Sequence, residues 1–481
     1  MSMSDLESIP FFSASRLVEL MRTGELTSST VVDAMLHRLD RVNPRIRAVV
    51  ALDAALARSQ ARASDEERAQ GTVRGPLHGL PFTAKDTFAT RDFPTTIGLP
   101  LYGARAPRNA AAVQALLDAG GILLGKTNVP FAAYDWQSNH PRFGRTHNPY
   151  DQNRTAGGSS GGAAAALAAS LSPLELGSDV AGSIRVPCHF CGVWGLRPTD
   201  GVVPIEGHAE VPFSSHRVRH MVRAGPMTRT GADLSLAFSV FSPTERTPSL
   251  PSPTTIRLRA SFGVEPFAPT PTVRATLTAF EERLSAAGVT LLRDPPSFDP
   301  EALTRLWGFI QGCDMSATLP ALARLPGFSW LNALAFFRGR LGHGIVTTAL
   351  RRGAQSSSKD LEGWLSEAEE EAKALEANLE GTDGWLLPVA PFPAFLHQRT
   401  GSPIHVEGRR FPYADAHAYY NCPVAVLGLP AVAFPAGVTT DNLPVGVQLV
   451  GRRGGDMRLV QVARTLAEAA GTEGRLVADD D

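Results

Sequence analysis

Apolar residues recur at helical spacing through the N-terminal part of the chain. This periodicity predicts helices over 13–22, 27–42 and 53–70, with serine and threonine residues placed to cap the second helix. A different pattern follows, because the short apolar run from Leu80 to Ala84 is typical of a buried strand. We therefore expect a helical layer over residues 1–70, followed by the first strand of a sheet.

Strand and helix patterns alternate along the rest of the chain. A helix predicted over 109–119 is followed by a glycine pair and a strand over 122–124. The same criteria predict further helices over 230–241, 271–287, 359–379 and 456–470, and strands over 289–292, 385–389 and 444–450. Alternation of this kind predicts an α/β protein built around a sheet.

The middle of the chain, residues 242–383, reads differently from the segments on either side. It opens with a stretch rich in Pro, Ser and Thr over 242–256, which we expect at the surface, and continues into a mostly helical segment, 299–340. Aromatic residues of that segment are candidates for lining a substrate pocket, with core packing as the alternative for each: Trp307, Trp330, Phe336 and Phe337. The charges of the helix over 359–379 are expected on a solvated face.

Small residues dominate the stretch from Gly157 to Pro187. A GGSSGG cluster leads into an alanine run over 163–169, which predicts a buried helix, and a second Gly-Ser pair leads into the strand-like SIRVP. A flexible linker is one alternative, but linkers are not followed by a helix and a strand. A phosphate-binding loop is another, but it would need a Gly-Lys-Ser/Thr or GxGxxG pattern that this stretch lacks.

Composition excludes several classes of function. The 481 residues are 43% hydrophobic and 19% charged, with a net charge of -1, so no large basic surface for nucleic acid is expected. The sequence has no apolar run long enough to span a membrane, and its first residues lack the pattern of a signal peptide. Four cysteines in so long a chain are typical of a reducing compartment, so we expect a cytoplasmic protein.

Two serines and one lysine carry the candidate chemistry. Ser159 and Ser183 each lie beside glycine, an arrangement that suggests a nucleophile, a second hydroxyl and a group of free backbone N–H donors. Lys85 follows a buried strand, where an ammonium group is costly without a partner. A lysine that extends to solvent from a strand end is the alternative for Lys85.

Together these motifs resemble the amidase signature family of serine hydrolases. The resemblance rests on LPFTAKD around Lys85, GGSSGG around Ser159 and SDVAGSIRVP around Ser183. It extends through GKTN at 125–128, FGRTHNP at 143–149, GLPAVAFPAG and LPVGVQLVG.

The resemblance implies an architecture for the whole chain. We expect the α/β amidase signature fold, a single domain over 1–481 with a mixed central sheet of about eleven strands surrounded by helices. Within it, residues 71–241 would form the signature core and 242–383 a variable, mostly helical region over the substrate pocket. Residues 384–481 would return to the sheet and end in a closing helix.

The resemblance also implies a catalytic triad. Ser183 would be the nucleophile, Lys85 the base, and Ser159 the bridging serine, preceded by a cis peptide bond after Gly158. This chemistry requires a neutral lysine, because only an uncharged amine accepts a proton, so burial must lower the pKa of Lys85 toward neutrality.

Further roles follow from the same resemblance. Backbone N–H groups of the run Val180, Ala181, Gly182 and Ser183 would form the oxyanion hole, and Asp179 and Arg185 would orient the site. Two residues depart from the usual family pattern. Ala181 stands where glycine is common, which a negative φ would tolerate, and Glu175 stands where a small residue is usual, so we expect its side chain to face outward.

The implied activity is that of an amidase acting on linear amides. It would convert a small-molecule carboxamide to a carboxylate and ammonia or an amine through an acyl-enzyme, with no metal and no organic cofactor. A homodimer is the default expectation for an enzyme of this size.

Alternative functions remain open. A glutaminase subunit of a tRNA-dependent amidotransferase has the same fold, but the aspartate such subunits carry before GLPA is replaced here around Ala418. A non-catalytic binding protein on this fold would lack at least one triad residue, and all three are present.

Two other kinds of site have weaker support in the sequence. The C-x-x-C formed by Cys188 and Cys191 could indicate zinc or redox chemistry, but no second ligand pair of matching spacing accompanies it. A histidine-based triad would have to use one of the histidines near the motifs, which are His78, His140, His147 and His189.

Overall fold

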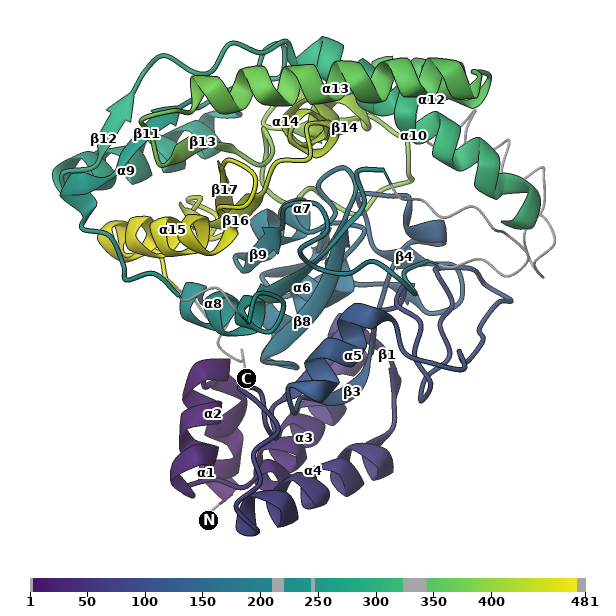
Figure 1. The fold of residues 1–481 in the computed structure, drawn as a ribbon, viewed down its shortest axis with the longest axis vertical. Helices are drawn as coiled ribbons and strands as arrows, with labels where there is room; N and C mark the ends of the chain where they lie inside the picture. Colours follow the sequence, from purple (N-terminus) through teal and green to yellow (C-terminus); the bar gives the residue numbers. More distant parts are fainter. Residues whose placement is uncertain (1–2, 210–219, 244–246, 323–343, 474–481) are drawn as a thin grey trace.

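An eleven-stranded mixed sheet runs through the computed structural model, which describes residues 3–209, 220–243, 247–322 and 344–473 (Figure 1). Its strand order is β1-β3-β2-β8-β10-β9-β16-β17-β13-β11-β12. The strands are β1 (Val49–Leu52), β2 (Pro81–Lys85), β3 (Ile122–Thr127), β8 (Leu174–Asp179), β9 (Trp194–Arg197), β10 (Arg223–Thr228), β11 (Arg257–Ala260), β12 (Thr290–Leu292), β13 (Gly384–Pro388), β16 (Ala431–Val438) and β17 (Pro444–Val450). The predicted mixed sheet is confirmed.

Strand direction changes across this sheet. β2 pairs in parallel with both β3 and β8, whereas the strands from β8 through β10, β9, β16 and β17 to β13 pair antiparallel. At the far edge, β13, β11 and β12 are parallel again. The parallel group formed by β3, β2 and β8 matters most for function, because the carboxyl ends of parallel neighbours meet at one edge.

Helices surround the sheet. They are α1 (Met3–Ser8), α2 (Ala14–Thr23), α3 (Ser28–Ile46), α4 (Ala54–Ala69), α5 (Ala111–Asp118), α6 (Gly161–Ala168), α7 (Arg185–Cys191), α8 (Gly231–Ser239), α9 (Pro271–Ala286), α10 (Pro300–Leu322), α12 (Ile345–Ala354), α13 (Ser358–Asn378), α14 (Asp415–Val426) and α15 (Asp456–Ala470). Three small hairpins pair β4 (Asn139–His140) with β5 (Gly144–Arg145), β6 (His147–Asn148) with β7 (Asp151–Thr155), and β14 (Ile404–Val406) with β15 (Arg409–Phe411).

The N-terminal helices begin close to where the sequence predicts them. Ser13, Thr27 and Asp53 cap α2, α3 and α4, because each side chain accepts a hydrogen bond from the backbone N–H three residues later. These helices form one end of the molecule, with α13 across the opposite end (Figure 1). Several strands of the sheet were not predicted. One is β1, which lies between α3 and α4 and pairs antiparallel with β3, and the others are β8, β9, β10, β11 and β16.

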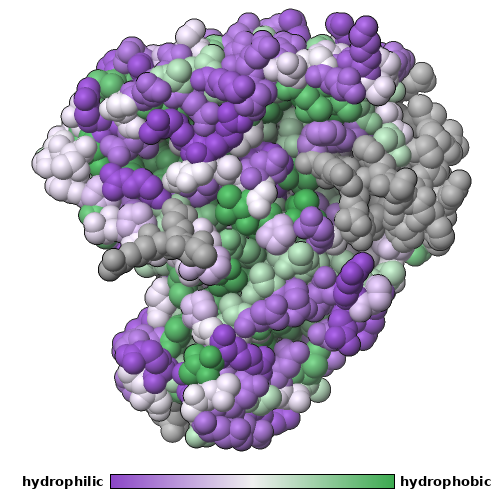
Figure 2. Space-filling view, viewed as in Figure 1, coloured by the Kyte–Doolittle hydropathy of each residue, from purple (hydrophilic) through white to green (hydrophobic). Residues whose placement is uncertain are grey.

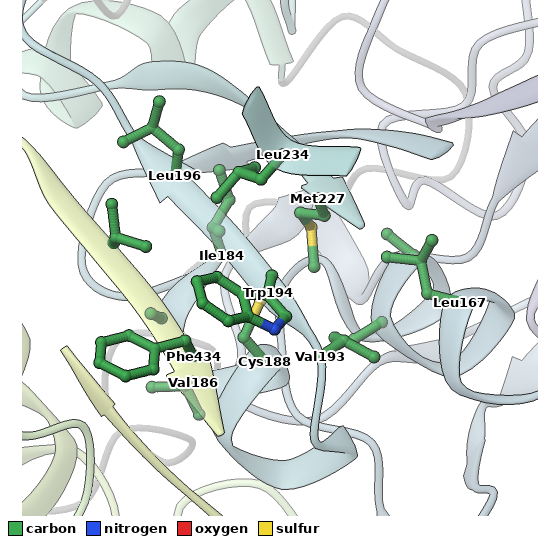
Figure 3. Packing of buried hydrophobic residues seen from close by; sticks show 14 of the residues in the cluster. Leu167, Ile184, Val186, Cys188, Val193, Trp194, Leu196, Met227, Leu234 and Phe434 are labelled. Carbon is green, nitrogen blue, oxygen red and sulfur yellow. The ribbon is translucent and has the colours of Figure 1, made fainter. Parts of the chain in front are cut away.

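Helices cover both faces of the sheet at its centre. A Cβ on Gly195 of β9 would meet Ile184 and Cys188, whereas the neighbouring Trp194 ring lies against Gly231 of α8. Because successive strand residues point to opposite faces, α7 and α8 lie on opposite sides of the sheet. Figure 3 shows this packing, with residues of α7 and its N-terminal flank gathered beside Trp194 and Phe434. The turn before α7 is thereby anchored in the core.

The alanine run forms α6, and every residue of that helix is buried, as predicted. The strand-like reading of SIRVP is wrong, because α7 begins at Arg185. The Gly182 carbonyl accepts a hydrogen bond from the Val186 N–H at 2.7 Å, which turns the chain helically directly after Ser183.

The middle region is mostly helical where the structure describes it. α10 covers the first part of the predicted helical segment and buries Trp307, whereas Trp330, Phe336 and Phe337 lie outside the described residues. α13 buries only Ala368, Ala372 and Leu375, and Figure 2 shows hydrophilic residues over this end of the molecule and apolar ones toward the centre. Among the described residues, no helix combines the length and apolar character that crossing a bilayer requires.

Candidate active site

Two neighbouring parallel strands carry the charged candidate residues to one edge of the sheet. Lys85 is the last residue of β2 and Asp179 is the last residue of β8. The two strands pair in register, with Thr83 opposite Glu175. The turn that carries Ser183 leaves β8 at this edge, so the topology places the lysine next to the serine-bearing turn.

Lys85 is almost fully buried and contacts oxygen atoms of two serines. Its Nζ atom lies 2.7 Å from the Oγ atom of Ser159, 3.0 Å from the Oγ atom of Ser178 and 3.2 Å from the Ser178 carbonyl oxygen. No carboxylate within the described ranges forms an ion pair with it. The other buried lysine, Lys126, differs in this respect because its Nζ atom lies 3.2 Å from an oxygen of Asp86.

This environment changes the pKa of Lys85. Burial, which disfavours the ammonium form, lowers the pKa from its ordinary value of 10.5 to about 7, and the more distant Asp179 carboxylate opposes the shift. A substantial fraction of Lys85 is therefore a neutral amine at neutral pH, as proton acceptance requires.

Ser159 lies deep in the small-residue cluster, with 2% of its surface exposed. The peptide bond between Gly158 and Ser159 is cis, as expected from the resemblance. A Cβ atom on Gly158 would clash with the backbone of Asp135 and Trp136, so only glycine fits there. The backbone thus approaches closely enough to place the Ser159 hydroxyl against Lys85.

Ser183 is half-buried, in contrast to Ser159 and Lys85. Its carbonyl oxygen accepts a hydrogen bond from the Ser160 N–H at 3.1 Å, which ties its turn to the residue after Ser159. Within the described part of the chain, the Ser183 hydroxyl forms no hydrogen bond. The three candidate triad residues therefore lie close together in the fold, and among the described residues no hydrogen bond joins the Ser183 hydroxyl to Ser159.

Asp179 and Arg185 form a buried ion pair around the Ser183 turn. The carboxylate accepts hydrogen bonds from Nε and Nη2 of Arg185, each at 3.0 Å, and Arg197 approaches it at 3.7 Å. Although burial alone would raise the pKa of Asp179, these guanidinium groups hold it well below its usual range. Arg185 also donates to the Gln448 side chain and the Asn421 carbonyl, so it links the turn to β17 and α14.

The four expected oxyanion donors are not equivalent. The Gly182 N–H donates to the Oδ1 atom of Asp179 at 2.8 Å, so it is already engaged. Among the described residues, no acceptor is found for the backbone N–H groups of Val180, Ala181 and Ser183. The φ angle of Ala181 is not positive, so its methyl group is tolerated as expected.

The expectation that Glu175 faces outward is wrong. Its side chain is fully buried and accepts hydrogen bonds from Thr83 and Thr127 on the adjacent strands. Burial raises its pKa to about 8, so the carboxyl group is protonated at neutral pH. A neutral acid tolerates this site, whereas a charged one would not.

Ser178 and His208 lie near the site but were not recognised from the sequence as part of it, and Trp307, a candidate for the pocket lining, contacts the Ser183 turn. Ser178 contacts Lys85, and the Nε2 atom of His208 lies 2.8 Å from the Ser178 hydroxyl. The indole of Trp307 donates to the Val180 carbonyl at 3.0 Å. The position of Ser178 directly before Asp179 was a usable signal, but nothing in the sequence places His208 there.

The remaining histidines and the C-x-x-C lie elsewhere. His189 bonds to backbone groups of Gly446 and Phe392, and His140 contacts the Thr96 hydroxyl. Cys188 and Cys191 are buried free thiols on α7. Across the ranges that the structure covers, no three His, Cys, Asp or Glu side chains gather in a metal-binding arrangement.

Comparison with known proteins is consistent with this geometry. The sequence matches the Amidase family over residues 30–460. This chain belongs to the amidase signature family. Its members are carbon–nitrogen hydrolases that act on small-molecule amides, and some are subunits of complexes.

Relatives of two kinds are similar to this chain at nearly the same identity. It is 30% identical to an acylamidase of Rhodococcus erythropolis, over 95% of each chain. It is 31% identical to a glutamyl-tRNA(Gln) amidotransferase subunit of Synechococcus sp. (strain CC9605), over 94% of each chain. A solved amidase structure with 30% identity superimposes with a TM-score of 0.81, covering 95% of this chain and 99% of that one. Similarity alone therefore does not separate the two activities.

Proposed function

We propose that this amidase hydrolyses linear carboxamides to a carboxylate and ammonia or an amine, with Ser183 as nucleophile, Ser159 as relay and Lys85 as base. The contact that carries the proposal is the 2.7 Å approach of the Lys85 Nζ atom to the Ser159 Oγ atom. A lysine held against a hydroxyl, with a pKa of about 7, is suited to accept a proton at neutral pH.

The reaction would proceed in two halves. In the first, Ser183 Oγ attacks the amide carbon while its proton passes to Ser159, whose own proton passes to Lys85. The C–N bond then breaks as the leaving nitrogen receives a proton back through the same relay, and an acyl-enzyme remains. In the second half, water attacks the ester of Ser183, and Lys85 again accepts and returns the proton, which releases the carboxylate.

The free backbone N–H groups on the Ser183 turn would stabilise the oxyanion. Val180, Ala181 and Ser183 supply donors without an acceptor among the described residues, whereas the Gly182 N–H serves Asp179. Removing one such donor typically slows an acyl-transfer enzyme by at least about 100-fold. We assign Gly182 to holding the turn and its three neighbours to binding the oxyanion.

Glutamine hydrolysis within an amidotransferase complex is the second candidate, because relatives of that kind lie at similar identity. The aspartate that such subunits carry before GLPA is replaced here around Ala418, which is buried in α14. The nearby carboxylate of Asp415 accepts hydrogen bonds from the N–H groups of Ile345 and Val346 at the start of α12. That carboxylate is therefore engaged by the fold, which favours the free amidase.

The test is release of ammonia or amine from a panel containing acetamide, benzamide, a p-nitroanilide, a long-chain amide and glutamine. Wild type, Ser183→Ala and Lys85→Met would be compared under identical conditions. We expect turnover of at least one simple amide by the wild type and a loss of about 1000-fold or more in both variants.

Other outcomes would redirect the assignment. Turnover of glutamine alone would favour the glutaminase. Equal turnover by wild type and Ser183→Ala would remove Ser183 from its role. No turnover, together with no labelling of Ser183 by a fluorophosphonate, would favour a binding protein on this fold.

A further inference from the structure

His208 lies on a segment that is fastened to the chain directly after Lys85. Backbone hydrogen bonds and a β-bridge join residues 207–209 to residues 87–89. The imidazole ring packs edge-on against the ring of Phe88, with 4.9 Å between their centroids. The position of His208 is thus fixed relative to the end of β2.

His208 is connected to Lys85 by hydrogen bonds through Ser178. Its Nε2 atom lies 2.8 Å from the Ser178 Oγ atom, which lies 3.0 Å from the Lys85 Nζ atom. On its other side, Lys85 contacts the Ser159 hydroxyl at 2.7 Å. His208, Ser178, Lys85 and Ser159 therefore form one continuous line of hydrogen bonds.

The hydrogen-bond donors and acceptors around a neutral Lys85 allow two arrangements of its lone pair. A neutral lysine amine has two N–H donors and one lone pair, and it meets three oxygen atoms. The Ser178 carbonyl can only accept, so it takes one N–H. The lone pair is then directed at either the Ser159 or the Ser178 hydroxyl, and only the first arrangement lets Lys85 take a proton from Ser159.

The tautomer of the neutral His208 ring selects between these arrangements. Among the described residues, the charged group that acts on the ring is Lys85, across Ser178. Burial, reinforced by the charge of Lys85, lowers the pKa of His208 to about 3, so the ring is neutral throughout the range in which Lys85 titrates. A neutral Nε2 that carries no proton accepts the Ser178 O–H, and the Ser178 oxygen is then left to accept from Lys85.

We propose that His208, with its ring proton on Nδ1, is a positioning residue that, through Ser178, directs the lone pair of Lys85 toward Ser159. The inference rests on the proposed role of Lys85 as the base. Without His208, the Ser178 O–H is free to donate to the Lys85 lone pair and competes with Ser159 for it.

Two substitutions at His208 separate hydrogen bonding from packing. His208→Phe keeps an aromatic ring beside Phe88 and removes the acceptor, whereas His208→Gln supplies an amide oxygen that can accept from Ser178. Ser178→Ala removes the middle of the line and leaves the backbone carbonyl of Ser178 in place. If His208→Phe fails to fold, His208→Leu, which also lacks an acceptor, takes its place.

The first measurement is the kinetics of the best amide substrate. We expect His208→Phe to lower kcat about tenfold with a smaller change in KM, because the base is misdirected and not removed. His208→Gln should recover most of this loss. The double variant His208→Phe/Ser178→Ala should be faster than His208→Phe, because it lacks the Ser178 hydroxyl that competes with Ser159 for the Lys85 lone pair.

The second measurement is independent of activity. The only lysines of this chain are Lys85, Lys126, Lys359 and Lys373, so the 13Cε signals of labelled lysine are few and Lys85→Met assigns the one of interest. We expect the Lys85 signal to titrate near pH 7 in the wild type. In His208→Phe, the midpoint should fall by about one pH unit, because a hydroxyl that donates to the lone pair favours the neutral amine.

Each outcome decides between the hypotheses. A slower His208→Phe with a lowered Lys85 midpoint, both restored in His208→Gln, supports the positioning role. Unchanged kcat and midpoint in His208→Phe overturn it, as do equal losses in the Phe and Gln variants without a change in the midpoint. A wild type inactive on amides, with the midpoint still dependent on His208, would disprove the proposed function and retain the positioning contact.

Discussion

The indole Nε1–H of Trp307 donates to the backbone carbonyl of Val180 at 3.0 Å. This hydrogen bond joins α10, in the middle region of the chain, to the turn that carries Ser183. The middle region thus contributes a hydrogen bond to the turn that carries Ser183.

Replacing Trp307 with Phe should therefore affect catalysis. The Val180 carbonyl loses its buried donor, at a cost of about 1 kcal/mol, and kcat/KM should fall about fivefold. Trp385→Phe is a matched control, because that indole also donates a buried hydrogen bond, to Ser261 at 2.9 Å, but on β13. A similar loss of kcat/KM in both variants would contradict a specific role for Trp307.

The pH dependence of the reaction should follow Lys85. Only the neutral amine acts as a base, so kcat/KM should rise with pH and reach half its maximum near pH 7, the pKa that burial gives this residue. Activity should fall tenfold per pH unit well below that point. Lys85→Met should abolish this acidic limb together with most of the activity, and an acidic limb centred below pH 5 would exclude Lys85 as its source.

Glu175 should make the fold less stable as the pH rises. Its pKa is about 8 in the folded protein against an ordinary value of 4.5, so the folded state binds the extra proton between these values and loses stability as pH increases through them. Glu175→Gln keeps the shape without the titration. Its free energy of unfolding, measured with urea, should match that of the wild type near pH 4 and exceed it by about 3 kcal/mol at pH 7.

Glu175→Gln is also expected to leave the pH dependence of catalysis unchanged. Glu175 bonds to Thr83 and Thr127 and contacts neither Lys85 nor Ser159. Glu175→Gln should therefore leave the pH profile of kcat/KM unchanged. A displaced acidic limb would show that Glu175 is coupled to the base.

The ion pair between Asp179 and Arg185 should be strongly coupled. Asp179→Asn leaves the fully buried guanidinium of Arg185 without its counter-charge, which typically costs about 3 to 5 kcal/mol of stability. Arg185→Gln should cost a similar amount, and the double variant should lose less than the sum of the two. Arg22→Ala, which breaks an exposed pair with Glu19, should leave unfolding unchanged.

The carboxylate of Asp179 should also determine how the stability of the fold changes at low pH. Its pKa lies below the ordinary value, so the pair stabilises the fold above about pH 4 and loses that effect as the pH falls further. Asp179→Asn should remove this acid dependence. Strictly additive losses in the double variant would contradict direct coupling.

Much of the fold could be predicted because local pattern and tertiary environment agree. The closing helix α15 has the predicted bounds, and α4 begins directly after its Asp53 cap. The strand predicted for SIRVP is wrong because local pattern and tertiary environment disagree there. Its alternating polar and apolar residues fit a strand, but hydrogen bonds from the backbone of the Ser183 turn to Asp179 start a helix there.

The candidate triad was predictable because its residues lie in motifs with a recognisable order along the chain. His208 was not, because its contact depends on a β-bridge between residues far apart in sequence. Glu175 was misplaced because a carboxylate is usually exposed, and only the two threonine donors on neighbouring strands make its burial acceptable.

The hydrogen bonds that Asp179 accepts from Gly182, Ile184 and Arg185 have a consequence for how the Ser183 turn meets a substrate. A turn fastened at three backbone positions loses its conformational entropy once, when the chain folds. It does not lose that entropy again with every substrate molecule. Even a small acyl group, with few contacts to offer, therefore meets a nucleophile and donors that are already ordered.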